Sequence, residues 1–350
     1  MTSYALADLG GPNTVSLAQN ESAFEVSQKA ISAAQTVLAQ TPLYPDPDWR
    51  DLRSVVADVH GLDDASLICG AGSMELIGCL IRTFAGPSDE VLGSQHGYLF
   101  VSTARQQARA TYVQAPEPEL TVSVDAIMAR VTARTKIMFV CNPGYPTGTR
   151  IKTPEILRMR AALPSSALLI VDQAYGEFDD QDPRPIFDLV SGGNTVVLRT
   201  FSQAYGLAAA RVGWGYFPVK ITSEVRKLLN PNNIAATSQV MATPSMRDQA
   251  HMINIVEKTA IIRDLFADTV RQMGMIVTVS HTNFGLIRFG SVAEARQADA
   301  ALRTHSLITR AMGGYGFAQC LRATIGAAQI MDQVLGVLSH LKEASDASRS

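Results

Sequence analysis

Three apolar runs recur about thirty residues apart in the middle of the chain, and each leads to polar side chains. They cover residues 137–141, 167–171 and 195–198, and they lead to Asn142, Asp172 and Ser202. Uninterrupted apolar runs of this length are typical of parallel strands covered on both faces, and the spacing fits one strand-helix-strand unit between neighbours. The pattern therefore predicts an α/β fold in which three strand ends carry polar groups to one site.

The segment that follows the third run combines groups that suit a bound phosphate. Residues 199–215 read Arg-Thr-Phe-Ser-Gln-Ala-Tyr-Gly-Leu-Ala-Ala-Ala-Arg-Val-Gly-Trp-Gly. Thr200 and Ser202 offer hydroxyl donors, and Arg211 offers a planar fork of N–H donors. Gly206 lets backbone approach closely.

A second phosphate-binding arrangement is predicted nearer the N-terminus. A short strand over 66–69, the turn Gly70-Ala71-Gly72 and an amphipathic helix over 73–84 follow one another. Free N–H groups and the positive end of the helix dipole would hold an anion there. A Gly-x-Gly turn also occurs in proteins as a simple tight turn, so this motif alone decides little.

Taken together, these segments resemble the fold-type I pyridoxal 5′-phosphate (PLP) enzymes, in the histidinol-phosphate aminotransferase branch. The segment around residue 203 is similar to the family's Ser-Lys-Ala-Tyr-Gly-Leu-Ala-Gly-Leu-Arg, and residues 142–148 match Asn-Pro-x-x-Pro-Thr-Gly. Residues 312–316 and 321–326 resemble Met-Gly-Gly-Tyr-Gly and Leu-Arg-Val-Thr-Ile-Gly. The resemblance runs from residue 20 to residue 341 and implies a PLP-dependent aminotransferase.

The resemblance implies an architecture as well. The large domain would hold a mostly parallel seven-stranded sheet between helices, and a smaller α+β domain would lie at the C-terminal end. We expect an N-terminal arm over the active site in residues 1–25, the large PLP-binding domain in 26–235 and the small domain in 236–350. Within the last of these, residues 237–273 are expected to be one long, mostly helical stretch.

Roles for the cofactor-binding residues follow from the same resemblance. Asn142 would donate to the phenolic oxygen of the pyridine ring, Tyr175 would tune that oxygen, and Tyr98 would lie near the ring face. Asp172 would keep the ring nitrogen protonated, which makes the ring an electron sink. The phosphate would be held by Ser73, Thr200, Ser202 and Arg211, with backbone N–H groups also at Met74, where the family usually has an acid.

Three further residues are implied in substrate binding and assembly. Arg322 would bind the carboxylate or phosphate of the substrate through the two-pronged geometry of its guanidinium group. Asn20 lies in an arm similar to the one that covers the substrate pocket in the family. Tyr44, in Leu43-Tyr44-Pro45-Asp46, would reach the cofactor phosphate of a neighbouring subunit, which implies a homodimer. Taken alone, this segment is more simply explained by a proline turn with a packed tyrosine.

One position departs from the family in a way that changes the chemistry. Gln203 stands where the family has the lysine that forms a Schiff base with the cofactor. An amide forms no imine with an aldehyde and is no base near neutral pH. General acid–base catalysis is typically worth about 100- to 10,000-fold, so transamination by this chain should be very slow.

Several explanations of Gln203 remain open at this point. The glutamine could be a deliberate replacement in an ordinary aminotransferase, or a natural feature of a specialised enzyme that catalyses another reaction on PLP or on pyridoxamine phosphate. A third alternative is a non-catalytic cofactor-binding protein. A nicotinamide-dependent dehydrogenase is disfavoured because no Gly-x-Gly-x-x-Gly follows a strand.

Composition limits the remaining function classes. Thirty Lys and Arg against 32 Asp and Glu give a net charge of -2 with no long run of like charge, so we expect a small-molecule amine substrate rather than nucleic acid or membrane. The four cysteines show no paired spacing and the six histidines no ligand spacing, so no metal site is predicted. No apolar stretch has the length of a membrane span, and a cytoplasmic location is expected.

Overall fold

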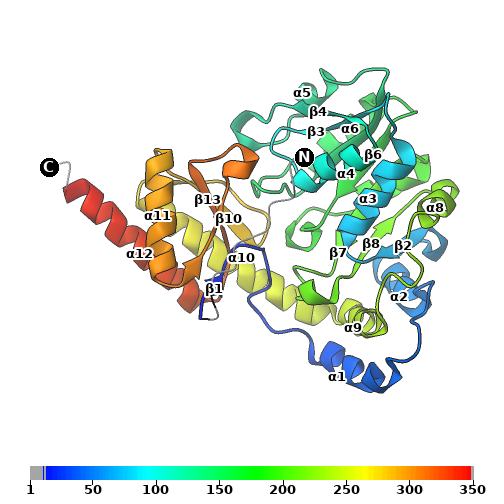
Figure 1. The fold of residues 1–350 in the computed structure, drawn as a ribbon, viewed down its shortest axis with the longest axis horizontal. Helices are drawn as coiled ribbons and strands as arrows, with labels where there is room; N and C mark the ends of the chain where they lie inside the picture. Colours follow the sequence, from blue (N-terminus) through cyan, green and yellow to red (C-terminus); the bar gives the residue numbers. More distant parts are fainter. Residues whose placement is uncertain (1–10, 12, 348–350) are drawn as a thin grey trace.

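The computed structural model describes residue 11 and residues 13–347, which form three sheets, and each of the two larger sheets has its own apolar core (Figure 1). The part of the predicted arm that covers residues 1–10 and 12 lies outside the described residues. No helix in the described part of the chain is long and apolar enough to cross a membrane.

The larger sheet has seven strands in the order β2-β8-β7-β6-β5-β3-β4. Their bounds are β2 Leu67–Gly70, β3 Glu90–Ser94, β4 Thr111–Ala115, β5 Thr135–Cys141, β6 Leu168–Asp172, β7 Thr195–Thr200 and β8 Gly213–Tyr216. All neighbouring pairs are parallel except those of β8, which runs antiparallel to both β2 and β7. The predicted mostly parallel, seven-stranded sheet is therefore confirmed.

The three apolar runs that end in polar residues became the adjacent strands β5, β6 and β7. Their side chains are buried almost throughout because helices cover the sheet, as a parallel sheet requires. The helices of this part are α1 Gln28–Val37, α2 Arg50–His60, α3 Ser73–Phe84, α4 Leu99–Gln107, α5 Val124–Met128, α6 Thr153–Ala162, α7 Arg184–Asp188 and α8 Val219–Arg226. Among them α3 inserts a broad apolar face, from Leu76 to Ile81, into the core.

The smaller sheet has four antiparallel strands in the order β12-β13-β10-β9. Their bounds are β9 Ile276–Val277, β10 Phe284–Arg288, β12 Arg310–Ala311 and β13 Cys320–Thr324. The helices α11 Val292–Thr304 and α12 Ala328–Ala347 accompany this sheet, and residues of α10, including Phe266 and Val270, complete its core. The arm joins this unit through β1 Val15–Ser16, which pairs in parallel with β11 Leu307–Ile308.

Two helices occupy the stretch predicted as one. α9 Ala236–Arg247 ends at Asp248, and α10 Gln249–Gln272 begins directly after it. Asp248 has φ −87° and ψ 56°, outside the helical region, four residues beyond Pro244. The stretch is therefore mostly helical, as predicted, with a break between two helices at Asp248.

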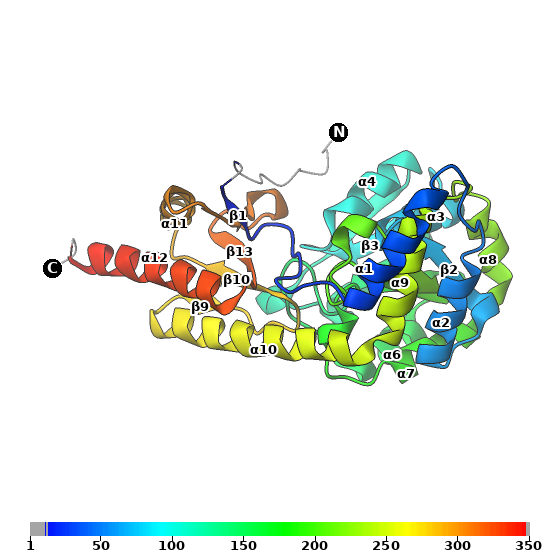
Figure 2. The ribbon, with the colours of Figure 1, turned by 90° about the horizontal axis from the view of Figure 1, so that it is seen from below.

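The two helices associate with different parts of the molecule. α9 packs against α1 and α2, and its Ala242 and Met246 belong to the larger core (Figure 2). α10 continues from there to the smaller sheet and contacts β9, β10 and α12. The domain boundary at residue 236 remains a prediction, and by its packing α9 belongs with the larger sheet.

Short 3-10 helices complete the chain. They cover Leu38–Gln40, Asp64–Ser66, Pro118–Leu120, Gly176–Phe178, Leu189–Gly192, Ala208–Ala210 and Gly313–Tyr315. Two of them matter for the site, because Gly176–Phe178 follows the end of β6 and Ala208–Ala210 precedes Arg211.

Candidate active site

A cavity of about 490 Å³ lies at the carboxyl ends of β5, β6 and β7. The N-terminal arm, the start of α3 and the strands β12 and β13 also contribute to its wall. Eleven of the predicted site residues line it: Asn20, Ser73, Met74, Tyr98, Asp172, Tyr175, Thr200, Ser202, Gln203, Arg211 and Arg322. Residues up to 300 positions apart in sequence thus meet in one pocket, although their individual roles remain predictions.

One end of the pocket is a cup of hydroxyl and guanidinium groups. The Thr200 hydroxyl donates to Ser202 Oγ at 3.0 Å, and Arg211 Nη1 donates to the same oxygen at 3.3 Å. Ser73 opens α3 on the other side of the cup, with Gly72 ahead of it at φ 80°. A Cβ at residue 72 would collide with the Arg211 guanidinium, so glycine is required for this approach. Hydroxyl donors, an arginine and a helix N-terminus together suit a phosphate.

Asp172 lies at the end of β6 and is 4% exposed. Its carboxylate accepts the Ala174 N–H at 3.1 Å and the weak Cys141 thiol donor at 3.8 Å, and neither partner carries a positive charge. Burial raises the pKa of Asp172 to about 7, against an ordinary value of 3.8. A cationic N–H group of a bound ligand would therefore stabilise the ionised form of this carboxylate.

Tyr175 and Asn20 form a hydrogen-bonded pair beside Asp172. Asn20 Nδ2 donates to the Tyr175 hydroxyl oxygen at 2.6 Å, and the Asn20 backbone N–H donates to Thr324 Oγ1 at 2.9 Å. The Tyr175 hydroxyl therefore accepts from the arm and keeps its own proton available. Burial raises the pKa of Tyr175, which keeps the hydroxyl protonated. In this arrangement Asn20 contacts Tyr175, a partner that the resemblance did not imply.

Asn142 does not line the pocket, although its neighbours Cys141 and Pro143 do. It is 1% exposed, and its amide exchanges two hydrogen bonds with the backbone of Ile151, one in each direction at 2.9 and 3.1 Å. The amide fixes the loop that follows β5. Nδ2 keeps a second hydrogen, so the predicted contact with the ring oxygen is neither formed nor excluded by these bonds.

The opposite end of the pocket is cationic. Arg322 on β13 is 1% exposed, and its Nη2 donates to the Ala18 carbonyl at 2.5 Å. Its Nε and Nη1 are buried and have no hydrogen-bond partner among the described residues. The guanidinium carbon lies 5.0 Å from the ring centre of Tyr145 and 5.3 Å from that of Phe284. Two free donors on a buried arginine form a ready site for an anionic group.

Sequence reasoning missed two residues of this end. Arg310 lines the pocket from β12, directly opposite Arg322 in the antiparallel register. Tyr145 also lines it, and its ring stacks parallel to Tyr175 at 6.5 Å. Tyr145 lies inside the predicted loop 142–148, so its place could have been inferred from the motif. Arg310 depends on strand pairing, which no local pattern reveals.

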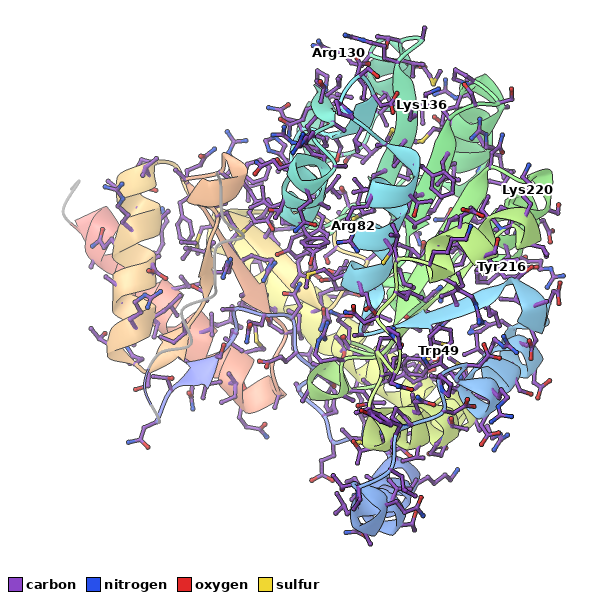
Figure 3. The ribbon with its side chains drawn as sticks, turned by 45° about the vertical axis from the view of Figure 1, so that its right-hand side comes forward. Trp49, Arg82, Arg130, Lys136, Tyr216 and Lys220 are labelled. Atoms are coloured by element: carbon purple, nitrogen blue, oxygen red, sulfur yellow. The ribbon has the colours of Figure 1, made fainter. Side chains whose placement is uncertain are left out.

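Gln203 lines the pocket where the family has its lysine. Its Oε1 is buried and has no hydrogen-bond partner in the described part of the chain. No lysine is among the residues that line the pocket. Lys136 is the second residue of β5, at the end of the strand opposite to Cys141, and Lys220 approaches Gly193 ahead of β7 (Figure 3). No described lysine therefore takes over the missing position.

Two other predicted residues lie differently from the rest. Tyr98 is at the wall, where its hydroxyl contacts Met74 Sδ at 3.4 Å. Tyr44 is 88% exposed and does not line the pocket of its own chain.

The groups present fit a pyridine-ring cofactor with a phosphate tail. Thr200, Ser202 and Arg211 would hold the phosphate, and the unpaired Asp172 would receive the protonated ring nitrogen. The Tyr175 hydroxyl can donate to the ring oxygen. Gln203, whose amide forms no Schiff base, would leave the cofactor without a covalent bond at this position.

Comparisons with known proteins identify the family of this chain. Residues 12–341 match the family model described as aminotransferase class I and II. The chain is 39% identical to the histidinol-phosphate aminotransferase of Paramagnetospirillum magneticum, over 94% of this chain and 92% of that relative. It is 38% identical to the enzyme of the same name from Rhodopseudomonas palustris, over 94% and 91%.

Solved structures share the fold. The histidinol-phosphate aminotransferase of Sinorhizobium meliloti, in complex with pyridoxal-5′-phosphate, has a TM-score of 0.87 at 24% identity and covers 95% of this chain and 91% of its own. A protein of Erwinia carotovora described as a putative histidinol-phosphate aminotransferase has a TM-score of 0.88 at 21% identity, covering 95% and 97%.

Proposed function

The chain belongs to the class I and II aminotransferase family, and on that premise we propose that it binds PLP, or the amine form pyridoxamine 5′-phosphate (PMP), without a covalent bond. The substrate would be an amine or amino acid with an anionic group, of the kind named for the histidinol-phosphate aminotransferases that it resembles. The observation that carries the proposal is Asp172, a buried carboxylate without a cationic partner among the described residues, which shares its pocket with a phosphate cup and a buried arginine.

Each group of side chains has a task in this proposal. The cup of Thr200, Ser202 and Arg211 binds the phosphate and fixes the ring above β6 and β7. Asp172 holds a proton on the ring nitrogen, and Tyr175, oriented by Asn20, donates to the ring oxygen. When bound, the cofactor supplies an electron-withdrawing ring that stabilises negative charge at the substrate's α-carbon.

The substrate's anionic group is assigned to the arginine end. Arg322 has two buried N–H donors without partners, and Arg310 faces it across the strand pair. A phosphate takes up more donors than a carboxylate, so two arginines favour a phosphate-bearing substrate. Mutation of Arg310 to Gln should then weaken a phosphate-bearing ligand more than a carboxylate of the same length.

With Gln203 in place of the lysine, the pocket would keep its cofactor-binding groups but lack the group needed for turnover. The side chain has neither the amine that would attach the cofactor nor a basic group for moving a proton at the α-carbon. The proposed activity of the chain as written is therefore binding with very slow transamination. The family match over most of the chain favours an aminotransferase over a reaction of another kind.

The proposal includes a homodimer. Tyr44 is 88% exposed, and its neighbour Leu43 is 69% exposed, which is costly for apolar side chains in an isolated chain. In a two-fold dimer both would be covered, and Tyr44 would complete the phosphate cup of the partner. Sedimentation should give the mass of two chains. A cytoplasmic location also remains a prediction.

The test is the variant Gln203→Lys, with Gln203→Met as a control of similar length that has no amine. Transamination should be measured with histidinol phosphate and other amino donors against 2-oxo acids, after cofactor loading has been verified. We expect Gln203→Lys to gain at least about 100-fold over the wild type, since it regains a base, while Gln203→Met gains nothing. Full loading of Gln203→Lys without any transfer would refute the aminotransferase proposal and favour divergent chemistry.

A further inference from the structure

Gln203 leaves an unmet hydrogen bond at the place where the covalent link would form. Its Oε1 is buried and unpartnered among the described residues, and Gln203 lines the pocket directly after Ser202 in the sequence. A buried carbonyl oxygen without a donor is costly, and native proteins rarely keep one unless a ligand or water completes it. The pocket therefore calls for a donor at this point.

The charges around the pocket indicate what kind of donor this is. In the family, the lysine brings a positive charge to the ring substituent, and this chain has lost that charge. The carboxylates that line the pocket are Asp172 and Glu21, and its arginines are Arg211 at the phosphate end and Arg310 and Arg322 at the substrate end. A bound phosphate adds about −1.5 to −2. The region between the two ends thus has no cation of its own.

We propose that the amine form of the cofactor, PMP, is the form that this pocket selects, with its primary ammonium group donating to Gln203 Oε1. This inference rests on the proposed function, because it assumes that the pocket holds the ring and the phosphate. The ammonium group satisfies the buried carbonyl and restores the missing positive charge. Substitution of lysine by glutamine then changes which form of the cofactor is resident, in addition to removing the covalent bond.

The other forms of the cofactor match the site less well. An aldehyde substituent offers only an acceptor oxygen, so it faces Gln203 Oε1 without a hydrogen bond. The amide can turn to present Nε2 to the aldehyde, but that bond joins two neutral groups and restores no charge. Hydrogen bonds to a charged donor are roughly twice as strong as those between neutral groups. With Oε1 towards the ligand, the ammonium is therefore the better partner.

Binding measurements on three ligands with the same ring and phosphate test the inference. PMP carries the amine, PLP the aldehyde, and pyridoxine 5′-phosphate a neutral hydroxymethyl group of nearly the same size as the aminomethyl group. Dissociation constants should be measured by calorimetry on the full-length wild type and on Gln203→Met and Gln203→Glu. Far-ultraviolet circular dichroism verifies that the variants are folded.

The expected pattern is specific to the ammonium contact. A charge-assisted hydrogen bond predicts that the wild type binds PMP about 10- to 100-fold more tightly than pyridoxine 5′-phosphate. Gln203→Met should lose that preference and bind the two ligands about equally, whereas Gln203→Glu should enlarge the preference because a carboxylate is the stronger acceptor.

Two outcomes would overturn the inference and can be told apart. Equal affinities of the wild type for PMP and pyridoxine 5′-phosphate, or a preference for PMP that survives in Gln203→Met, would show that Gln203 does not select the amine, while the cofactor pocket itself stands. Failure of all three ligands to bind would refute the proposed function and the inference together.

Discussion

The buried carboxylate at the end of β6 should make the stability of the ligand-free protein depend on pH. Burial raises the pKa of Asp172 from 3.8 to about 7. In the unfolded chain the carboxyl group ionises near 3.8, so between these values the folded state binds more protons than the unfolded state. This group's contribution to stability is fully present below pH 3.8 and is lost as the pH rises through about 7.

The size of the effect follows from the two pKa values. One pKa unit corresponds to about 1.4 kcal/mol, so the full shift is worth on the order of 4 kcal/mol. Between about pH 5 and about pH 8 the unfolding free energy should fall by about 2 to 3 kcal/mol because of this one group. Glu177 and Glu117 also have raised pKa values because they are buried, so the wild type alone cannot isolate the effect.

The variant Asp172→Asn separates the contribution of Asp172 from that of the other buried carboxyl groups. Asparagine has nearly the same shape, its carbonyl can keep the bond from the Ala174 N–H, and it cannot ionise. Urea unfolding of both ligand-free proteins at the two pH values gives four free energies. The advantage of the variant over the wild type should be about 2 to 3 kcal/mol greater at pH 8 than at pH 5. An advantage that is the same at both pH values would refute the conclusion that Asp172 is buried without a cationic partner.

Two further substitutions probe the ends of the pocket. Arg322→Met should raise the unfolding free energy by about 1 kcal/mol, because it removes a buried charge with unpartnered donors. The same variant should no longer bind anionic substrates. Urea unfolding measures the first effect and calorimetry the second, and a large loss of stability would contradict the prediction. Gly72→Ala should weaken cofactor binding by at least about tenfold, because the added Cβ collides with Arg211 at a positive φ that alanine tolerates poorly. Unchanged affinity in Gly72→Ala would contradict the assigned cup, whereas the matched change Gly192→Ala, a glycine with open space around it, should leave binding unaffected.

The sequence predicted those features that depend on local pattern and spacing. The apolar runs that end at Asn142 and Asp172 became adjacent central strands, since burial on both faces requires an unbroken apolar stretch. The cup was predictable because Ser73 begins a helix and because Arg211 and Ser202, which share a hydrogen bond, are only nine residues apart in the sequence. These features could be predicted from the sequence because they depend on a regular pattern or on residues close together in the chain.

Features that depend on contacts between residues far apart in the chain could not be predicted from the sequence. Asn20 reaches Tyr175 across 155 positions, and Arg310 meets Arg322 only through the register of β12 on β13. The two hydrogen bonds between the Asn142 amide and the Ile151 backbone were not anticipated, and the contact of Asn142 with the ring oxygen remains a prediction. The break at Asp248 separates two helices with similar composition, so composition could not show it.

Cofactor binding without covalent attachment is tested most directly by reduction with borohydride followed by mass spectrometry. The wild type should be saturated with PLP, showing a bound chromophore at about one per chain, then treated with borohydride, denatured and digested. We predict saturable binding that Asp172→Asn weakens, and a peptide containing Gln203 with no added mass. Absence of saturable binding, or a bound PLP that reduction fixes to another residue of the pocket, would contradict the account.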